Sequence, residues 1–153
     1  VTLDRAVSGP LLRQRHSAEL VREEFEKAGR PFPEIVIDDA LAEMPAERLA
    51  KRFMPQLCAD DAECLALVQE YMAAQDKKDK ERLFQKPFEK MMLKWATKEY
   101  HDDEIETFEY FVNRVKDSFS AITSNNRNGQ RVAAFTSGGP TAIAMHLALN
   151  TSF

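Results

Sequence analysis

The stretch that decides the fold runs from Arg131 to Leu149 and reads RVAAFTSGGPTAIAMHLAL. Its apolar residues 132–135 predict a short buried strand, and the apolar residues after Pro140 recur at helical spacing. Proline is tolerated in a first helical turn, where an N–H group would be unpaired in any case. Gly138 and Gly139 allow a sharp turn and the close approach of a ligand. The stretch therefore predicts a strand, a loop and a helix.

A helix that begins after such a loop presents unpaired N–H groups at its N-terminus. These groups carry a partial positive charge of about half a unit and favour an anion. Thr136–Gly139 is therefore a candidate site for a phosphate or a carboxylate. The alternative is that Gly138 and Gly139 only shape the turn.

Composition narrows the class of protein. The chain has 153 residues, 44% hydrophobic and 30% charged, which fits one globular domain. A net charge of −4 argues against non-specific binding of nucleic acid, and no apolar run approaches the roughly 20 residues of a membrane span. Cys58 and Cys64 have no nearby set of zinc ligands. We therefore predict free thiols in a reducing cytoplasm, and neither nucleic acid nor a membrane as partner.

Strands alternate with helices along the chain. Strands are predicted within residues 1–8, 35–37 and 132–135, and helices over about 11–28, 45–53 and 103–123. This order predicts an α/β fold with a mainly parallel sheet, in which ligands bind beyond the carboxyl ends of the strands. Three loops follow the strands, and we expect them at one edge of the sheet: Ser8–Arg13, Asp38–Glu43 and Thr136–Gly139.

The predicted domain spans residues 1–153 and includes a helical insert over about 60–100. Because the chain opens on a strand without an initiator methionine and stops at a helix end, it reads as truncated at both ends. Pro87 is expected to end or kink one helix of the insert. The aromatic residues of the insert fit a helical core, or contact with substrate at a pocket mouth: Tyr71, Phe84, Phe88, Trp95 and Tyr100.

The first loop supplies Arg13 and Arg15 at the start of a helix. Arginine is always charged and binds phosphate through two N–H groups at once. A first-turn arginine opposes the helix dipole, so helix stability does not explain it. The alternative is that one or both side chains only point to solvent.

The second loop supplies Asp38, Asp39 and Glu43. Glu43 stands between Ala42 and Met44, a partly apolar setting that suits a general acid, although a surface carboxylate is the alternative. An arginine, a carboxylic acid and an anion-binding turn together suit the cleavage of a phosphomonoester. No nucleophile is evident among these residues.

Three motifs, in order, give a resemblance to a known family. Residues 8–19, SGPLLRQRHSAE, resemble the S-x-L-x-R-x-x-x-T-A signature of the histidine phosphatase superfamily, the phosphoglycerate mutase-like proteins. Leu41–Glu43 resembles the L-x-E segment of that family, and residues 135–139 resemble its late S-H-G-G loop. The helical insert resembles a bacterial-type branch that reads F-T-S-G-G. The resemblance implies a three-layer α/β sandwich with a mainly parallel sheet and a helical insert.

The resemblance also implies a mechanism. A histidine in an R-H-G motif attacks phosphorus, a glutamic acid protonates the leaving alcohol, and cationic side chains hold the phosphoryl charge. By matching positions it assigns phosphate binding to Arg13, Ser137 and Gly138, and proton donation to Glu43. Ser137 stands where the family has its second histidine, and the loss of a charged donor there costs about 10²–10³ in rate. No metal or organic cofactor is implied, and the expected ligands are phosphorylated small molecules or phosphoproteins.

The R-H-G strand of the family is expected upstream of Val1. Arg15 and His16 are not its equivalent, because they fall inside a predicted helix, where His16 is expected on the helix face. His101 and His146 match no motif of the family. On this interpretation the 153 residues are an inactive fragment of a phosphatase.

Two other functions stay open. A degraded phosphatase site can hold phosphorylated ligands without turning them over, which makes a non-catalytic binding module the main alternative. A serine hydrolase is the other, because Ser137 lies on a strand-to-helix turn. However, the residues Thr-Ser-Gly-Gly lack the G-x-S-x-G pattern of a nucleophile elbow.

Overall fold

The computed structural model describes residues 2–124 and 129–149. It divides the chain into two compact units. The sheet unit comprises Val1–Met44 and Phe111–Phe153, and the helical unit comprises Pro45–Tyr110. The helical unit thus begins and ends outside the 60–100 segment that the sequence indicates. Most of the turn expected at 124–129 lies outside the described residues.

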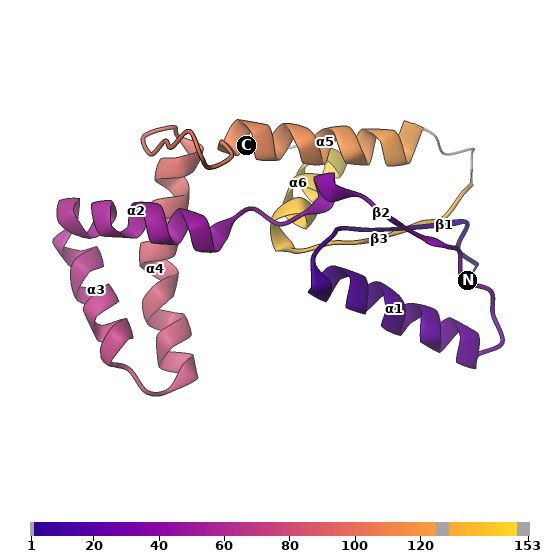
Figure 1. Cartoon of the computed structure of the whole chain (residues 1–153), viewed down its shortest axis with the longest axis horizontal. Helices are drawn as coiled ribbons and strands as arrows, with labels where there is room; N and C mark the ends of the chain where they lie inside the picture. The colour runs from indigo at the N-terminus through magenta and orange to yellow at the C-terminus, as the bar shows by residue number, and fades with distance from the viewer. Residues whose placement is uncertain (1, 125–128, 150–153) are drawn as a thin grey trace. The chain divides into compact units, whose positions relative to one another are not determined.

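The sheet contains three parallel strands, β1 (Arg5–Ser8), β2 (Ile35–Ile37) and β3 (Val132–Phe135), in the order β2-β1-β3 (Figure 1). A mixed α/β fold with a small parallel sheet is thus confirmed. The central strand β1 is the buried one, whereas β3 is only half-buried and Ala134 is exposed. The prediction of a buried strand at residues 132–135 was wrong in this respect, because among the described residues β3 pairs with a neighbour on one side only.

The helices of the sheet unit are α1 (Leu12–Lys27), α6 (Gly138–Leu149) and most of α5 (Phe108–Ser124). Figure 1 shows α1 and α5 on opposite sides of the strands. Successive strand residues face opposite sides of a sheet, so Ala6 and Val7 both become buried. Val7 packs with Leu41 and with Ile122 of α5. Each fully buried aliphatic side chain of this kind contributes about 1.5–3 kcal/mol.

The helical unit contains α2 (Ala46–Asp60), α3 (Ala62–Ala73) and α4 (Lys77–Ala96). Helix α2 passes Pro55 and ends at Asp60, seven residues after the predicted end at Phe53. Helix α4 likewise continues through Pro87, whose ring is buried. Burial of the proline ring in the core offsets part of the free-energy cost of the helical hydrogen bond that proline cannot make. All three helices contribute fully buried side chains: Leu49, Phe53 and Leu57 from α2, Cys64 from α3, and Pro87 and Met91 from α4.

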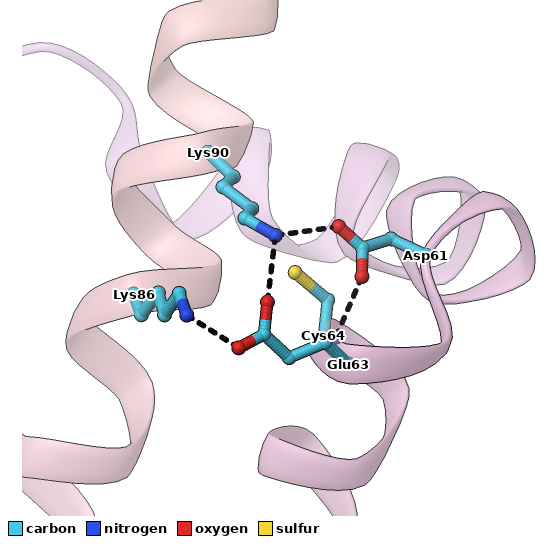
Figure 2. A network of polar contacts seen from close by, with 5 residues as sticks. All are labelled: Asp61, Glu63, Cys64, Lys86 and Lys90. Atoms are coloured by element: carbon cyan, nitrogen blue, oxygen red, sulfur yellow. Dashed lines mark hydrogen bonds and ion pairs between the residues drawn. The ribbon is translucent and has the colours of Figure 1, made fainter.

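An ion-pair network joins α3 to α4 (Figure 2). The Lys90 ammonium donates to Asp61 at 2.7 Å and to Glu63 at 3.2 Å, and Lys86 pairs with Glu63. Asp61 also caps α3 by accepting the Cys64 N–H at 3.0 Å. Lys90 and this N–H hold the pKa of Asp61 well below its usual range, and Lys86 and Lys90 lower the pKa of Glu63. All four charges of the network therefore have partners inside the helical unit.

Candidate functional site

The three predicted loops begin side by side at one edge of the sheet. Ser8, Ile37 and Phe135 are the last residues of the three strands, and they lie opposite one another in the parallel register. Two backbone bonds extend this register into the loops, from Gly9 N to the Phe135 oxygen and from Asp38 N to the Ser8 oxygen, both at 2.9 Å. Side chains of the three loops can therefore meet at this edge.

Arg13 and Ser137 are in direct contact. The guanidinium Nε of Arg13, in the first turn of α1, donates to the Ser137 hydroxyl at 3.2 Å. The two Nη groups of Arg13 have no partner among residues 2–124 and 129–149, and the side chain is exposed. Arg13 thus keeps its planar pair of N–H donors available while Ser137 fixes one end of the guanidinium.

Glu43 lies beside the start of α6. One carboxyl oxygen accepts the Gly139 N–H and the other accepts the Met44 N–H, both at 3.0 Å. A methyl group at residue 139 would lie 2.2 Å from the Glu43 carboxyl, so only glycine allows this approach. The second predicted loop is therefore joined to the third through the proposed proton donor.

Gly138 supplies the unpaired N–H at the N-terminus of α6. The Gly139 N–H is taken by Glu43, Pro140 has none, and the Thr141 N–H binds the Ser137 carbonyl at 3.1 Å. Within the described part of the chain, the Gly138 N–H has no acceptor, and a methyl group added to its Cα would meet nothing within 4 Å. This N–H, the helix dipole and the Arg13 guanidinium each favour an anion, whereas the Glu43 carboxyl on the Gly139 N–H is an acidic group at the same helix end.

Two residues that the sequence reasoning missed hold the site together. Gln14 is 1% exposed, and its side-chain amide contacts Leu11, Leu41 and Ser137. Arg114 of α5 donates to the carbonyls of Ala40 and Ala42, both at 2.8 Å, and so holds the loop that carries Glu43. The sequence gives one indication for Gln14: it lies one helical turn before Ala18, so both residues are on the buried face of α1. For Arg114 no local signal exists, because its partners lie more than 70 residues away.

The remaining candidates from the sequence lie elsewhere or are occupied. Asp38 accepts the Ser118 hydroxyl at 2.6 Å and the Ala40 N–H at 2.9 Å, so it stabilises its own loop. Asp39, Arg15 and His16 are exposed. His146 lies in α6, and His101 lies in the helical unit beside Asp103.

The aromatic residues of the predicted insert pack on one another. Tyr71 contacts Phe84, which contacts Phe88, with ring centroids 5.4 and 5.5 Å apart. Trp95 and Tyr100 are 3% and 4% exposed, so little of either ring is open to a ligand. Cys58 and Cys64 are free thiols, and burial raises the pKa of both. The packing of the five aromatic residues fits a role in the helical core better than contact with substrate.

Known proteins add no further assignment. No protein-family model matches the chain, and no curated protein and no solved structure matches it either. Among the described residues no helix has the length and apolar character to cross a membrane, and no three His, Cys, Asp or Glu side chains are grouped to hold a metal ion. The family resemblance therefore stays a prediction based on the three sequence motifs.

Proposed function

We propose that the sheet unit is the phosphate-binding part of a phosphomonoester hydrolase or mutase of the histidine phosphatase superfamily. In this proposal its sheet belongs to a three-layer sandwich of the phosphoglycerate mutase type. The nucleophilic histidine lies on a strand upstream of Val1. The ligands are phosphorylated small molecules or phosphoproteins.

One observation carries the proposal: three donors from two loops lie at one sheet edge, next to a carboxyl group. The donors are the Arg13 Nη groups, the Ser137 hydroxyl and the Gly138 N–H, and the carboxyl is that of Glu43. A phosphoryl group has three equatorial oxygens that take charge-assisted hydrogen bonds from such donors. The Glu43 carboxyl accepts the N–H of Gly139, the residue after Gly138. It therefore lies beside the donors and leaves the Gly138 N–H available for a ligand.

In the proposed reaction the histidine nitrogen forms a bond to phosphorus as the ester P–O bond breaks. Glu43 gives its proton to the departing alcohol oxygen, and Arg13, Ser137 and Gly138 stabilise the charge on the phosphoryl oxygens. Water then attacks phosphorus and gives a proton to the Glu43 carboxylate, the P–N bond to histidine breaks, and phosphate leaves. Because Ser137 is neutral, Arg13 and the α6 dipole must provide most of the positive charge.

Titration with inorganic phosphate tests the binding step on the chain as it stands. We expect saturable shifts of the Gly138 and Gly139 amide signals in NMR spectra. Arg13→Met should weaken phosphate binding about 10- to 100-fold, since a hydrogen bond to a charged group is worth about 1.5–3 kcal/mol. Arg15→Met is the matched control, because Arg15 is exposed on the same helix. Equal losses for the two variants, or no saturable shift at Gly138, would count against the site.

A second function, phosphate-ligand binding without turnover, is favoured by a specific observation. Ser137 supplies a hydroxyl where a catalytic site of this kind would have an imidazole, and no histidine is a hydrogen-bond partner of Ser137 in the described part of the chain. A natural chain with an upstream Arg-His-Gly segment should hydrolyse para-nitrophenyl phosphate and lose this activity in Glu43→Gln. Binding without hydrolysis in that longer chain would instead support the binding module.

The serine hydrolase alternative requires a base that activates Ser137. The two groups that contact the Ser137 hydroxyl are both hydrogen-bond donors, from Arg13 and Gln14. A donor cannot remove the hydroxyl proton, so we expect no labelling of Ser137 by a fluorophosphonate probe.

A further inference from the structure

The Ser137 hydroxyl receives two hydrogen bonds from the protein. Arg13 Nε donates to it at 3.2 Å, and Gln14 Nε2 donates at 2.9 Å. A serine hydroxyl has two acceptor positions and one proton. Because both acceptor positions are filled, the proton must point away from Arg13 and Gln14. Among residues 2–124 and 129–149, no group accepts it.

Gln14 is fixed in one orientation by its other contacts. Its amide oxygen accepts the Leu11 N–H at 3.1 Å, and its amide nitrogen donates to the Leu41 carbonyl at 3.0 Å and, at a longer 3.4 Å, to the Thr136 hydroxyl. If the amide were flipped, its NH₂ group would face the Leu11 N–H, and its oxygen would face the Leu41 carbonyl oxygen. The two partners therefore determine which end of the amide faces Ser137. The nitrogen end must face Ser137, and Gln14 therefore always meets that hydroxyl as a donor.

The side chain of Gln14 is closely packed. The residue is 1% exposed, and a methyl group on Gly9 would come within 2.2 Å of its amide oxygen. The bond to Leu11 is the one that a glutamine at the third helical position makes in a capping box. Capping explains one of the contacts of Gln14. It does not explain the contacts to Leu41 and Ser137, which lie in the other two loops.

We propose that Gln14 is a positioning residue that turns the Ser137 hydroxyl into a dedicated donor for a phosphoryl oxygen. The proposal rests on the proposed function. With both acceptor positions of Ser137 filled, the hydroxyl contributes its proton to the ligand and accepts nothing from it. Its proton, the Gly138 N–H and the Arg13 Nη groups then all face a phosphoryl oxygen as donors, and the neighbouring Glu43 carboxyl is bound to the Gly139 and Met44 N–H groups. Such a set of donors selects a fully deprotonated phosphoryl group over a protonated one.

The first experiment uses the ligand-free chain. The Gln14 side-chain amide protons should be protected from solvent exchange and should give nuclear Overhauser effects to the Ser137 side chain. Ser137→Ala should speed their exchange. Unprotected Gln14 amide protons in the wild-type chain overturn the positioning role whether or not phosphate binds, and this readout needs no Gln14 variant to fold.

The second experiment is a double-mutant cycle with inorganic phosphate as the probe. Gln14→Met keeps the length of the side chain but removes its donors, and it should weaken phosphate binding about tenfold in the wild-type background. In the Ser137→Ala background the same change should have less than a twofold effect. A residue that only stabilises the fold would instead cause the same loss in both backgrounds, and that result overturns the proposal.

The outcomes separate the two proposals. Phosphate bound equally well by wild type and Gln14→Met overturns the positioning role and leaves the proposed function standing. Protected Gln14 amide protons in a wild-type chain that binds no phosphate overturn the proposed function. In that case the contact between Gln14 and Ser137 is structural.

Discussion

Lys90 of the helical unit and Arg13 of the sheet unit are used in opposite ways. In the helical unit, Lys90 donates to two carboxylates, and the network of Figure 2 is closed on itself. In the sheet unit, Arg13 gives one N–H to a neutral hydroxyl and keeps its two Nη groups without a partner among the described residues. A paired cation mainly stabilises the fold, whereas a cation that is oriented but unpaired can bind a ligand.

Exposure alone does not distinguish the two cases, since unpaired surface arginines are common. Arg13 differs because a contact from another loop of the sheet edge orients its guanidinium. That contact, Ser137, is itself held by buried Gln14. The sheet unit thus uses a buried polar residue to orient surface donors, which the helical unit does not do around Lys90.

The strongest test of this difference is Gly9→Ala. The added methyl group would lie 2.2 Å from the Gln14 amide oxygen and 2.7 Å from the Leu41 carbonyl oxygen. Since the backbone at Leu41 and the pinned amide of Gln14 cannot both move without a large penalty, we expect a loss of about 1–3 kcal/mol in the stability of the sheet unit. This loss is measured by the hydrogen exchange of the Val7 and Ser8 backbone amides at increasing denaturant concentration.

Gly138→Ala is the matched control for this variant. A methyl group at residue 138 meets nothing within 4 Å, so the sheet unit should keep its stability. If Gly9→Ala is as stable as Gly138→Ala, then Gln14 can move without cost and the contrast between the units fails.

A smaller effect is expected for Gly139→Ala. Its methyl group would lie 2.2 Å from the Glu43 carboxyl and 2.9 Å from the Met44 methyl, both ends of flexible side chains, and 3.0 Å from the buried Phe111 ring, which needs to shift by only a few tenths of an ångström. Glu43 should therefore swing away and lose its bond to the Gly139 N–H, at a cost of about 1 kcal/mol. Loss of the nuclear Overhauser effect between the amide at position 139 and the Glu43 side chain, with Arg13 and Ser137 unchanged, is the expected observation.

The local parts of the fold could be predicted from the sequence. The strands at 35–37 and 132–135 and the helix start near Leu12 follow from apolar runs bounded by glycine and proline. Parallel pairing then places the three loops at one edge, and the matches to the family motifs indicate Arg13 and Ser137 among the residues of these loops. The predicted helix end near Phe53 was wrong, and Pro87 does not end its helix, because burial and helix packing in the helical unit outweigh the local cost of proline.

The residues that hold the site could not be predicted in the same way. Gln14 contacts residues 27 and 123 positions away, and Arg114 contacts residues 72 and 74 positions away. No periodicity or turn signal specifies such contacts, since they depend on how loops from separate elements meet. The sequence can thus indicate ligand-binding groups such as Arg13 and Ser137. It does not indicate the residues that orient them, such as Gln14 and Arg114.

The smallest expected effect concerns the pH dependence of the helical unit. The pKa values of Asp61 and Glu63 are lowered in the folded chain, first by the hydrogen bonds from Lys90 and Lys86 respectively. A lowered folded pKa gives stability that is complete above the unfolded value of about 4 and is lost as the pH falls below it. We therefore expect the urea midpoint, followed by the fluorescence of the single buried Trp95, to fall between pH 5 and pH 3.

Lys90→Met shows how much of this acid sensitivity belongs to the network. Other carboxylates of the helical unit also have lowered pKa values, Asp102 beside Arg52 among them, so the wild-type slope has several sources. Without Lys90, the stability gained by ionising Asp61 shrinks, and the variant should lose less stability between pH 5 and pH 3 than the wild type does. Lys90 itself adds no dependence in this range, because its pKa is raised and its contribution fades only above about pH 10.4. An unchanged acid slope in Lys90→Met would mean that the ion pairs of the helical unit are as dispensable as isolated surface charges. The contrast with Arg13 would then rest on the sheet unit alone.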